Sequence, residues 1–299
     1  MGLRLDRLAT LYLTAPFLRV VPRRERSVPI LMYHSITDED ESNTHAYFRT
    51  KTSPAVFAAQ LKWLHDSGYT TCSLAQALQQ LQTQTPAADK LVVITFDDGY
   101  RDIYQQAFPL LNQYGFSATV FLPTAYIGEH PVLFKGRECL TWAEVRELNH
   151  RGILFGSHTV NHPQLRELSV SAVREEIRNS KKTIEEQLGC AVDSFAYPYA
   201  FPQTDSDFTS MLRDSLRQAG YQNGVCTVVG LAKRRSEPLF LERLPVNSCD
   251  DRALFNAKLA GAYDWISKFQ FVTKTVKSRL RNSVSGAKGG VSKDFPAVQ

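Results

Sequence analysis

A cysteine framework is missing from this sequence. The five cysteines are scattered and odd in number, with no Cys-x-x-Cys pair, so the pattern argues against structural disulfides and favours a reducing compartment. Internal repeats are also absent, and no segment interleaves aromatic and basic residues as nucleic-acid-binding modules do. The formal net charge of +5 is too small to indicate a nucleic-acid partner.

A long hydrophobic run is lacking as well. Residues 8–21 are apolar in bulk but are interrupted by Thr14, Pro16 and Arg19, and the run is too short to span a bilayer. Two arginines precede it, as in a signal peptide, but no small-x-small cleavage site follows. We therefore expect residues 1–27 to form an amphipathic segment at a membrane interface, with a helix packed on the domain as the alternative.

The remaining chain is typical of one large α/β domain. Its 299 residues, of which 43% are apolar, suffice to bury a full core. Short apolar runs alternate with helical patterns over residues 28–250, and this alternation predicts a parallel sheet that is closed or partly closed. We expect a basic helical segment over 251–282, with its aromatic helix at 255–271, and a disordered tail over 283–299.

Two adjacent acids follow a predicted buried strand. The apolar run 91–94 leads into residues 95–99, which read Thr-Phe-Asp-Asp-Gly. Because the chain turns before the glycine, both Asp97 and Asp98 can face one cleft. A carboxylate buried there needs a metal ion or a cationic partner.

Two histidines follow another predicted strand. Residues 157–162 read Ser-His-Thr-Val-Asn-His and come after the apolar run 153–155. His158 and His162 lie four residues apart, so one helical turn would place both imidazoles on one face. Together with a carboxylate they form a ligand set that suits Zn²⁺ or a similar ion with open positions for water. We expect Ser157 and its neighbour Thr159 to make strand-end hydrogen bonds.

These motifs resemble those of the polysaccharide deacetylase, or NodB-homology, family of carbohydrate esterases. The first matches the family's TFDDG motif and the second its H-[ST]-x-x-x-H motif, and residues 195–199 resemble its R-x-P-Y segment without the arginine. The resemblance covers residues 28–250. It implies a distorted (β/α)7 barrel of the NodB-homology type, with N- and C-terminal helical extensions and with its chemistry at the carboxyl ends of the strands.

The resemblance also implies a reaction. The chain would be a metal-dependent hydrolase that removes N-acetyl groups from an N-acetylated sugar by cleaving a linear amide C–N bond. Asp98, His158 and His162 would hold Zn²⁺, or another divalent ion such as Co²⁺, Ni²⁺ or Fe²⁺. Asp97 would be the general base, with a second metal ligand as the alternative, and the backbone N–H of Tyr199 would stabilise the oxyanion.

The sequence departs from the family pattern in two places. Ala196 stands where the base-steering arginine is expected, and Arg243 is our candidate to replace it, with an ordinary surface arginine as the alternative. The late Leu-x-His motif that supplies the general acid is missing, since residues 244–247 contain no histidine. His34 ends the first predicted barrel strand, so we expect it to be the general acid, with a structural histidine as the alternative.

Several functions stay open from the sequence alone. The leading prediction is N-deacetylation of a polysaccharide, glycolipid or lipid-linked oligosaccharide, with residues 126–139 as an irregular loop at the rim of the substrate groove. The alternatives are a deacylase of an O-acetyl ester or a formamide, and a non-catalytic glycan-binding relative. The scattered cysteines predict a cytoplasmic location, and basic residues at both ends predict peripheral contact with the inner membrane. Export is the alternative location.

Overall fold

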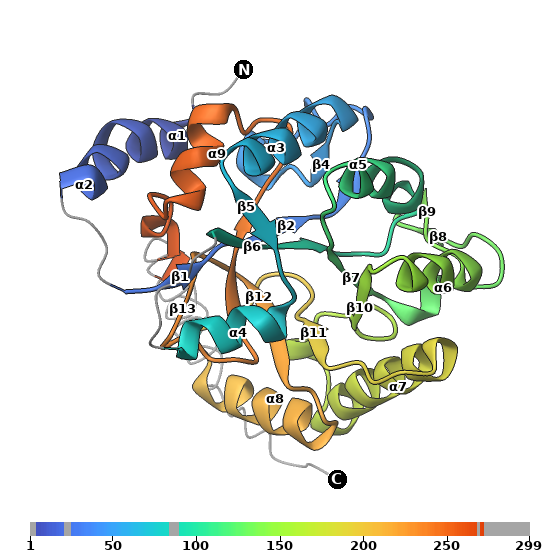
Figure 1. Ribbon diagram of the computed structural model, residues 1–299. Helices are drawn as coiled ribbons and strands as arrows, with labels where there is room; N and C mark the ends of the chain where they lie inside the picture. The colour runs from blue at the N-terminus through green and yellow to red at the C-terminus, as the bar shows by residue number, and fades with distance from the viewer. Residues whose placement is uncertain (1–3, 21–24, 84–89, 268–269, 272–299) are drawn as a thin grey trace, which may run out of the picture.

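A closed barrel of parallel strands forms the centre of the computed structural model, which describes residues 4–20, 25–83, 90–267 and 270–271 (Figure 1). The barrel strands are β2 (Ile30–Tyr33), β6 (Lys90–Phe96), β7 (Thr119–Leu122), β10 (Leu154–Ser157), β11 (Ser194–Ala196), β12 (Asn223–Val229) and β14 (Leu241–Pro245). Round the barrel they follow the order β2, β14, β12, β11, β10, β7 and β6, and parallel pairing of β2 with β6 closes it. The predicted (β/α)7 barrel is therefore confirmed.

Helices surround the barrel. They are α3 (Pro54–Asp66), α4 (Leu74–Gln82), α5 (Phe108–Gln113), α6 (Trp142–His150), α7 (Val170–Leu188) and α8 (Ser206–Gln218). Ser53 caps α3 by accepting the N–H of Val56, with Pro54 at the first helical position. Gly189 ends α7 with a φ of 66°. A π-helical turn, Ile103–Ala107, precedes α5.

The alternation of side chains along the strands explains what fills the barrel. Ile30, Val93 and Leu241 are fully buried and pack together in one cluster. Residues of α4 belong to this cluster, and α4 lies across the barrel in Figure 1. Successive side chains of a strand point to opposite faces, so the next inward positions are two residues further along. On β6 and β14 these are Thr95 and Arg243, which makes the next layer polar.

Two segments of the chain contain short regular elements. The segment after His34 includes β3 (Ser35–Ile36), a 3-10 helix (Ala46–Phe48) and β4 (Lys51–Thr52). The segment 126–139 was expected to be irregular but contains a hairpin of β8 (Leu133–Phe134) and β9 (Arg137–Glu138). The remaining short elements are β1 (Ser27–Val28), β5 (Tyr69–Thr71), β13 (Ala232–Lys233) and the 3-10 helices Thr124–Tyr126 and Leu165–Glu167.

The two ends of the described chain pack on each other. A continuous helix formed by α1 (Leu5–Ala9), a π-helical turn (Thr10–Thr14) and α2 (Ala15–Val20) contacts α9 (Arg252–Leu259). The aromatic helix predicted over 255–271 is interrupted, because α9 ends at Leu259 and a turn follows with Gly261 at φ 75°. Residues 265–267 and 270–271 are again helical, as predicted.

Two further predictions concern these ends. Residues 272–282, the basic part of the predicted C-terminal segment, and the tail 283–299 lie outside the described residues. The domain boundaries at 27/28 and 250/251 stay predictions. Among the described residues, no helix is long and apolar enough to cross a membrane. All five cysteines are free, as the sequence predicts.

Candidate metal centre

Three predicted ligands meet at the carboxyl ends of the barrel strands. Asp98, just after β6, and His158 and His162, after β10, each offer a ligand atom, and these atoms lie within 4.8 Å of one another. Asp98 Oδ1 is 3.2 Å from His162 Nε2 and 3.6 Å from His158 Nε2. All three residues are buried. The structure thus brings together the set that the sequence predicts.

The two histidines do not share a helical turn, so that part of the prediction was wrong. The loop after Ser157 doubles back through positive φ at Thr159 (71°) and His162 (52°). Thr159 Oγ1 accepts the N–H of His162, and Ser157 Oγ accepts the N–H of Thr159, which confirms the strand-end hydrogen bonds expected of both residues. Glu176 of α7, which the sequence analysis missed, accepts two backbone N–H groups of this loop.

Burial and one hydrogen bond prepare His158 to be a ligand. Its Nδ1 lies 2.8 Å from the carbonyl oxygen of Ala196. Because a carbonyl oxygen can only accept, Nδ1 carries the proton of the neutral imidazole, and the lone pair of Nε2 faces Asp98. Burial lowers the pKa of His158 to about 4, against the opposing charge of Asp97. The imidazole is therefore neutral near pH 7, which is the form that binds metal ions.

The donor atoms of the cluster fit a divalent ion. Asp98 Oδ1 is buried and accepts no well-formed hydrogen bond among the described residues, although two imidazoles face it. Burial opposes ionisation of Asp98, but His162, whose Nε2 lies 3.2 Å from Oδ1, and the nearby His34 hold its pKa below the usual range. A carboxylate and two imidazoles are a donor set that suits a divalent transition metal with open positions.

Asp97 has a different partner from its neighbour. Both of its carboxylate oxygens accept hydrogen bonds from Arg243, Nη1–Oδ1 and Nη2–Oδ2, each of 2.7 Å. Arg243 is fully buried inside the barrel, so it is not the surface arginine that the sequence left as an alternative. Its Nε donates to the carbonyl oxygen of Cys226, and Nη1 also donates to Thr95. Burial opposes ionisation of Asp97, but Arg243 outweighs it and lowers the pKa.

His34 lies beside Asp97. It follows β2, and its Nε2 is 4.0 Å from Asp97 Oδ2. Its side chain is partly exposed, at 21%, so a bound substrate can reach it. The structure therefore places His34 at the site, and its function as general acid stays a prediction.

Backbone strain is concentrated at this site. Among the described residues, five that are not glycine have positive φ: Asp98, Lys135, Thr159, His162 and Tyr199. All five belong to the metal centre or line it, because Lys135 Nζ lies 3.6 Å from Asp98 Oδ2 and the Tyr199 ring lies 4.6 Å from that of His162. Such conformations cost free energy and persist where the surrounding structure enforces them, often at functional sites.

The β8–β9 hairpin supplies a residue that the sequence analysis missed. Lys135, at its turn, places its ammonium group near Asp98 and over the rings of Phe134 and Tyr199, at 4.5 and 5.4 Å from their centroids. A single lysine in a polar segment carries no sequence signal that separates it from a surface lysine. Only the hairpin, which the sequence did not predict, brings it to the site.

A polar cavity of about 450 Å³ opens beside the hairpin. Its lining includes Glu39, Asp102 and Arg137, and it reaches Thr37, three residues after His34. Arg137 Nη2 donates to Asp102 Oδ2 over 2.7 Å, and Ser35 donates to the same oxygen. Oδ1 of Asp102 is buried with no hydrogen-bond partner among the described residues.

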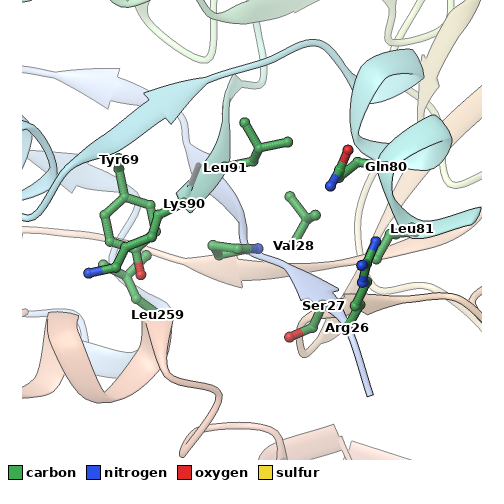
Figure 2. Close-up of a pocket in the computed structure, with 10 residues that line it drawn as sticks. Arg26, Ser27, Val28, Tyr69, Gln80, Leu81, Lys90, Leu91 and Leu259 are labelled. Atoms are coloured by element: carbon green, nitrogen blue, oxygen red, sulfur yellow. The ribbon is translucent and has the colours of Figure 1, made fainter. Parts of the chain in front are cut away.

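A separate cavity of about 270 Å³ lies at the opposite end of the barrel, where strands begin (Figure 2). Val28 lies two residues before β2 and Lys90 at the start of β6, and Leu81 reaches the cavity from α4. Its ten described lining residues include no carboxylate and no histidine. Among the described residues, the cluster of Asp98, His158 and His162 thus lies at the other end of the barrel.

A parallel barrel with such a cluster at its carboxyl ends defines a class of enzymes whose reactions take place at that face. The family model described as polysaccharide deacetylase matches residues 84–224 of this chain. YxkH of Bacillus subtilis (strain 168), named as a polysaccharide deacetylase, is 32% identical over 230 residues, which cover 77% of this chain and 75% of that protein. This chain belongs to the polysaccharide deacetylase family and is an enzyme of the deacetylase class.

Two further relatives agree with this family. The poly-β-1,6-N-acetyl-D-glucosamine N-deacetylase of Staphylococcus aureus (strain NCTC 8325 / PS 47) is 25% identical over 201 residues, covering 61% of this chain and 68% of that protein. The solved structure of the Streptococcus pyogenes deacetylase PplD, in complex with acetate, is similar with a TM-score of 0.68 and 27% identity, covering 79% of this chain and 99% of that one.

Proposed function

We propose that this enzyme removes N-acetyl groups from an N-acetylated sugar in a polysaccharide or a lipid-linked oligosaccharide by metal-assisted hydrolysis of the amide bond. The observation that carries the proposal is the gathering of Asp98, His158 and His162 beside Asp97, a second carboxylate with a lowered pKa. The Staphylococcus aureus relative, named for N-deacetylation of poly-β-1,6-N-acetyl-D-glucosamine, supports an N-acetyl sugar as the substrate.

We propose Zn²⁺ as the ion held by Asp98, His158 and His162, because one carboxylate and two imidazoles leave positions open for water and substrate. Co²⁺, Ni²⁺ and Fe²⁺ accept the same donors. A bound ion of this kind polarises the acyl carbonyl and lowers the pKa of the attacking water.

Asp97 acts as the general base in this proposal. Its ionised carboxylate takes the proton from the attacking water, and Arg243 fixes its orientation through two hydrogen bonds. Because Arg243 engages both oxygens, Asp97 is a weaker candidate for a second metal ligand. Arg243 thereby takes the place of the arginine that is missing at Ala196.

Two further groups serve the tetrahedral intermediate and its collapse. The backbone N–H of Tyr199, in a strained segment beside His162, stabilises the developing oxyanion. His34, 4.0 Å from Asp97, gives a proton to the leaving amine. The amine then leaves as a neutral group and acetate is released.

The cavity beside the hairpin supports a glycan as substrate. Charged side chains of both signs line it, and Asp102 and Arg137 there present acceptor and donor groups close together. Sugar hydroxyls both donate and accept hydrogen bonds, so a second sugar unit fits this lining. The five free cysteines support a reducing compartment, and we place the enzyme in the cytoplasm.

Acetate release tests the proposed function. N-acetylglucosamine oligomers, peptidoglycan fragments and lipid-linked sugars should be compared with an O-acetylated xylan and a formamide. We expect release from an N-acetylated sugar, its loss after chelation and its recovery with Zn²⁺. Asp97→Asn should lower turnover by about 10²–10⁴-fold. Release only from the ester or the formamide would move the activity to those acyl groups. Glycan binding without any release would show a non-catalytic relative.

A further inference from the structure

The N-terminal helix carries its apolar side chains on the outside. Six large hydrophobic residues of this helix are 37–80% exposed, and apart from the adjacent pair Tyr12 and Leu13 they recur three or four positions apart. We call them the outer face: Leu5, Leu8, Tyr12, Leu13, Phe17 and Val20. In a helix, this spacing places residues on one side. Leu11 and Leu18, which lie off this face, are half-buried.

Polar side chains attach the other side of this helix to the domain. The pairs are Asp6 with the Tyr263 hydroxyl, Thr10 with the Trp265 indole N–H, and Thr14 with the Ala262 carbonyl, at 2.7, 3.1 and 2.6 Å. Thr10 is fully buried. A surface helix of a soluble protein usually buries its apolar stripe and exposes its polar one. This helix does the reverse, and its hydrogen bonds fix it in that orientation.

A contiguous apolar face of this kind indicates a surface that something else covers. Single exposed hydrophobic residues are common on soluble proteins, but a row of six along one helix is not. Arg4 Nη1 donates to the carbonyl of Cys249, in the turn that follows β14, over 2.9 Å. The helix therefore begins at the end of the barrel that carries the metal centre. Figure 1 shows it outside α9, at the edge of the molecule.

The distribution of charge selects the covering surface. Residues 1–26 and 265–299 together contain thirteen lysines and arginines but three acids. The 238 residues between them contain 22 lysines and arginines and 27 acids. The positive charge of the sequence is thus concentrated in its two terminal segments, the first of which includes the outer face, and such charge is attracted to anionic lipid headgroups. It would oppose the approach of a second copy of the same end.

We propose that the outer face is a docking surface for an anionic lipid bilayer, on which the helix lies in the interface without crossing it. Basic segments and a row of leucine and aromatic side chains are the two features that bind interfacial helices to membranes. Docking through this face brings the catalytic end of the barrel close to the lipid headgroups. A glycan attached to a lipid is then within reach of the site.

Vesicle flotation of the full chain tests this proposal. Vesicles of equal parts phosphatidylglycerol and phosphatidylcholine should bind the protein at low salt, and pure phosphatidylcholine vesicles should bind it less. The double variant Leu13→Asp/Phe17→Asp should reduce the bound fraction by about tenfold or more, because two apolar side chains leave the interface. A neutral pair, Leu13→Gln/Phe17→Gln, should do the same and so separates loss of apolar contact from added negative charge.

Val170→Asp is the matched control. Val170 is 46% exposed at the start of α7, a helix that lies across the barrel from α1 in Figure 1, and its substitution should leave binding unchanged. All variants should keep the thermal midpoint of the parent, since Leu13 and Phe17 are 69% and 62% exposed. Acetate release from a soluble oligomer should also be unchanged, so a failure of docking is distinguishable from a failure of the proposed activity.

Three outcomes would overturn the proposal. In the first, the parent protein stays unbound at low salt. In the second, a double variant floats like the parent. In the third, the parent is a dimer that does not bind vesicles, and both double variants are monomers that do not bind them either. The last outcome would assign the outer face to a second copy of the chain.

Discussion

Arg243 and Asp97 form two parallel hydrogen bonds of 2.7 Å although 146 residues separate them in sequence. Arg243 is fully buried and Asp97 is 2% exposed, so the pair lies in the barrel interior. β14 and β6 both pair with β2, and this closure brings the two side chains together. An arginine held in this way keeps the carboxylate ionised and oriented.

Removing Arg243 should therefore leave the buried carboxylate of Asp97 without a cationic partner. Arg243→Met should lower the free energy of unfolding by about 3–5 kcal/mol, since Asp97 loses its partner. Urea unfolding followed by circular dichroism measures this. The double variant Arg243→Met/Asp97→Asn should be more stable than the sum of the single losses predicts. Arg217→Met, at a 60% exposed arginine, is the control and should cost less than about 1 kcal/mol. An equally small cost for Arg243→Met would show that the pair is dispensable for stability.

Each metal ligand should be required for the ion. Asp98→Ala, His158→Ala and His162→Ala should lose bound Zn²⁺ while the far-ultraviolet circular dichroism stays that of the barrel, because the ligands follow strands rather than form them. Elemental analysis of dialysed protein gives the occupancy. Asp97→Asn is the control and should retain the ion. Full occupancy in any two of the three alanine variants would refute the ligand assignment.

His34 should control proton donation. His34→Gln should lower turnover by about 10²–10⁴-fold with a smaller effect on KM, and should remove the alkaline limb of the pH–rate profile. His65→Gln changes a histidine whose side chain is 58% exposed, far along α3, and should leave the profile intact. A His34→Gln enzyme with the parent's alkaline limb would point to another donor.

Lys135 should compete with the metal ion. Its ammonium group lies 3.6 Å from Asp98 Oδ2, at the carboxylate that would bind the ion. Lys135→Met should tighten Zn²⁺ binding by about two- to fivefold, the range expected for a partly exposed ion pair. Lys135→Arg keeps the charge and should bind Zn²⁺ like the parent. Competition with a chelating dye measures both. Weaker binding in Lys135→Met would instead indicate that the lysine helps to form the site.

Acid should weaken the packing of the N-terminal helix on the domain. Burial opposes ionisation of Asp6, but hydrogen bonds from Arg4 and Tyr263 outweigh it and lower the pKa. A lowered pKa in the folded state means that Asp6 contributes stability above the unfolded carboxylate pKa of about 3.9, and that this contribution is lost as pH falls through the folded value. Asp6→Asn should therefore be less stable than the parent near neutral pH, and the difference should shrink below about pH 3.9. A constant difference in urea midpoints across this range would contradict the linkage.

Local patterns in the sequence predict the barrel class and the residues of the metal cluster. Adjacent acids before Gly99 and two histidines four apart are local patterns, and apolar strands alternating with helices predict a parallel α/β fold. Gly99 shows why such a motif is readable, because at φ 59° an added Cβ would approach Leu122 to 2.9 Å. Local sequence could not predict how His158 and His162 meet, since Thr159 and Glu176 shape that loop.

Long-range packing sets the contacts that the side chains of Arg243 and Lys135 make. The period of side chains along β14 makes Arg243 inward, but only closure of the barrel places it on Asp97, because the two strands meet through β2. Lys135 reaches Asp98 through a hairpin whose turn depends on positive φ at two residues. The outer face of the N-terminal helix depends on contacts with residues about 250 positions away. Spacing along a chain defines which residues share a face, whereas long-range packing defines what that face meets.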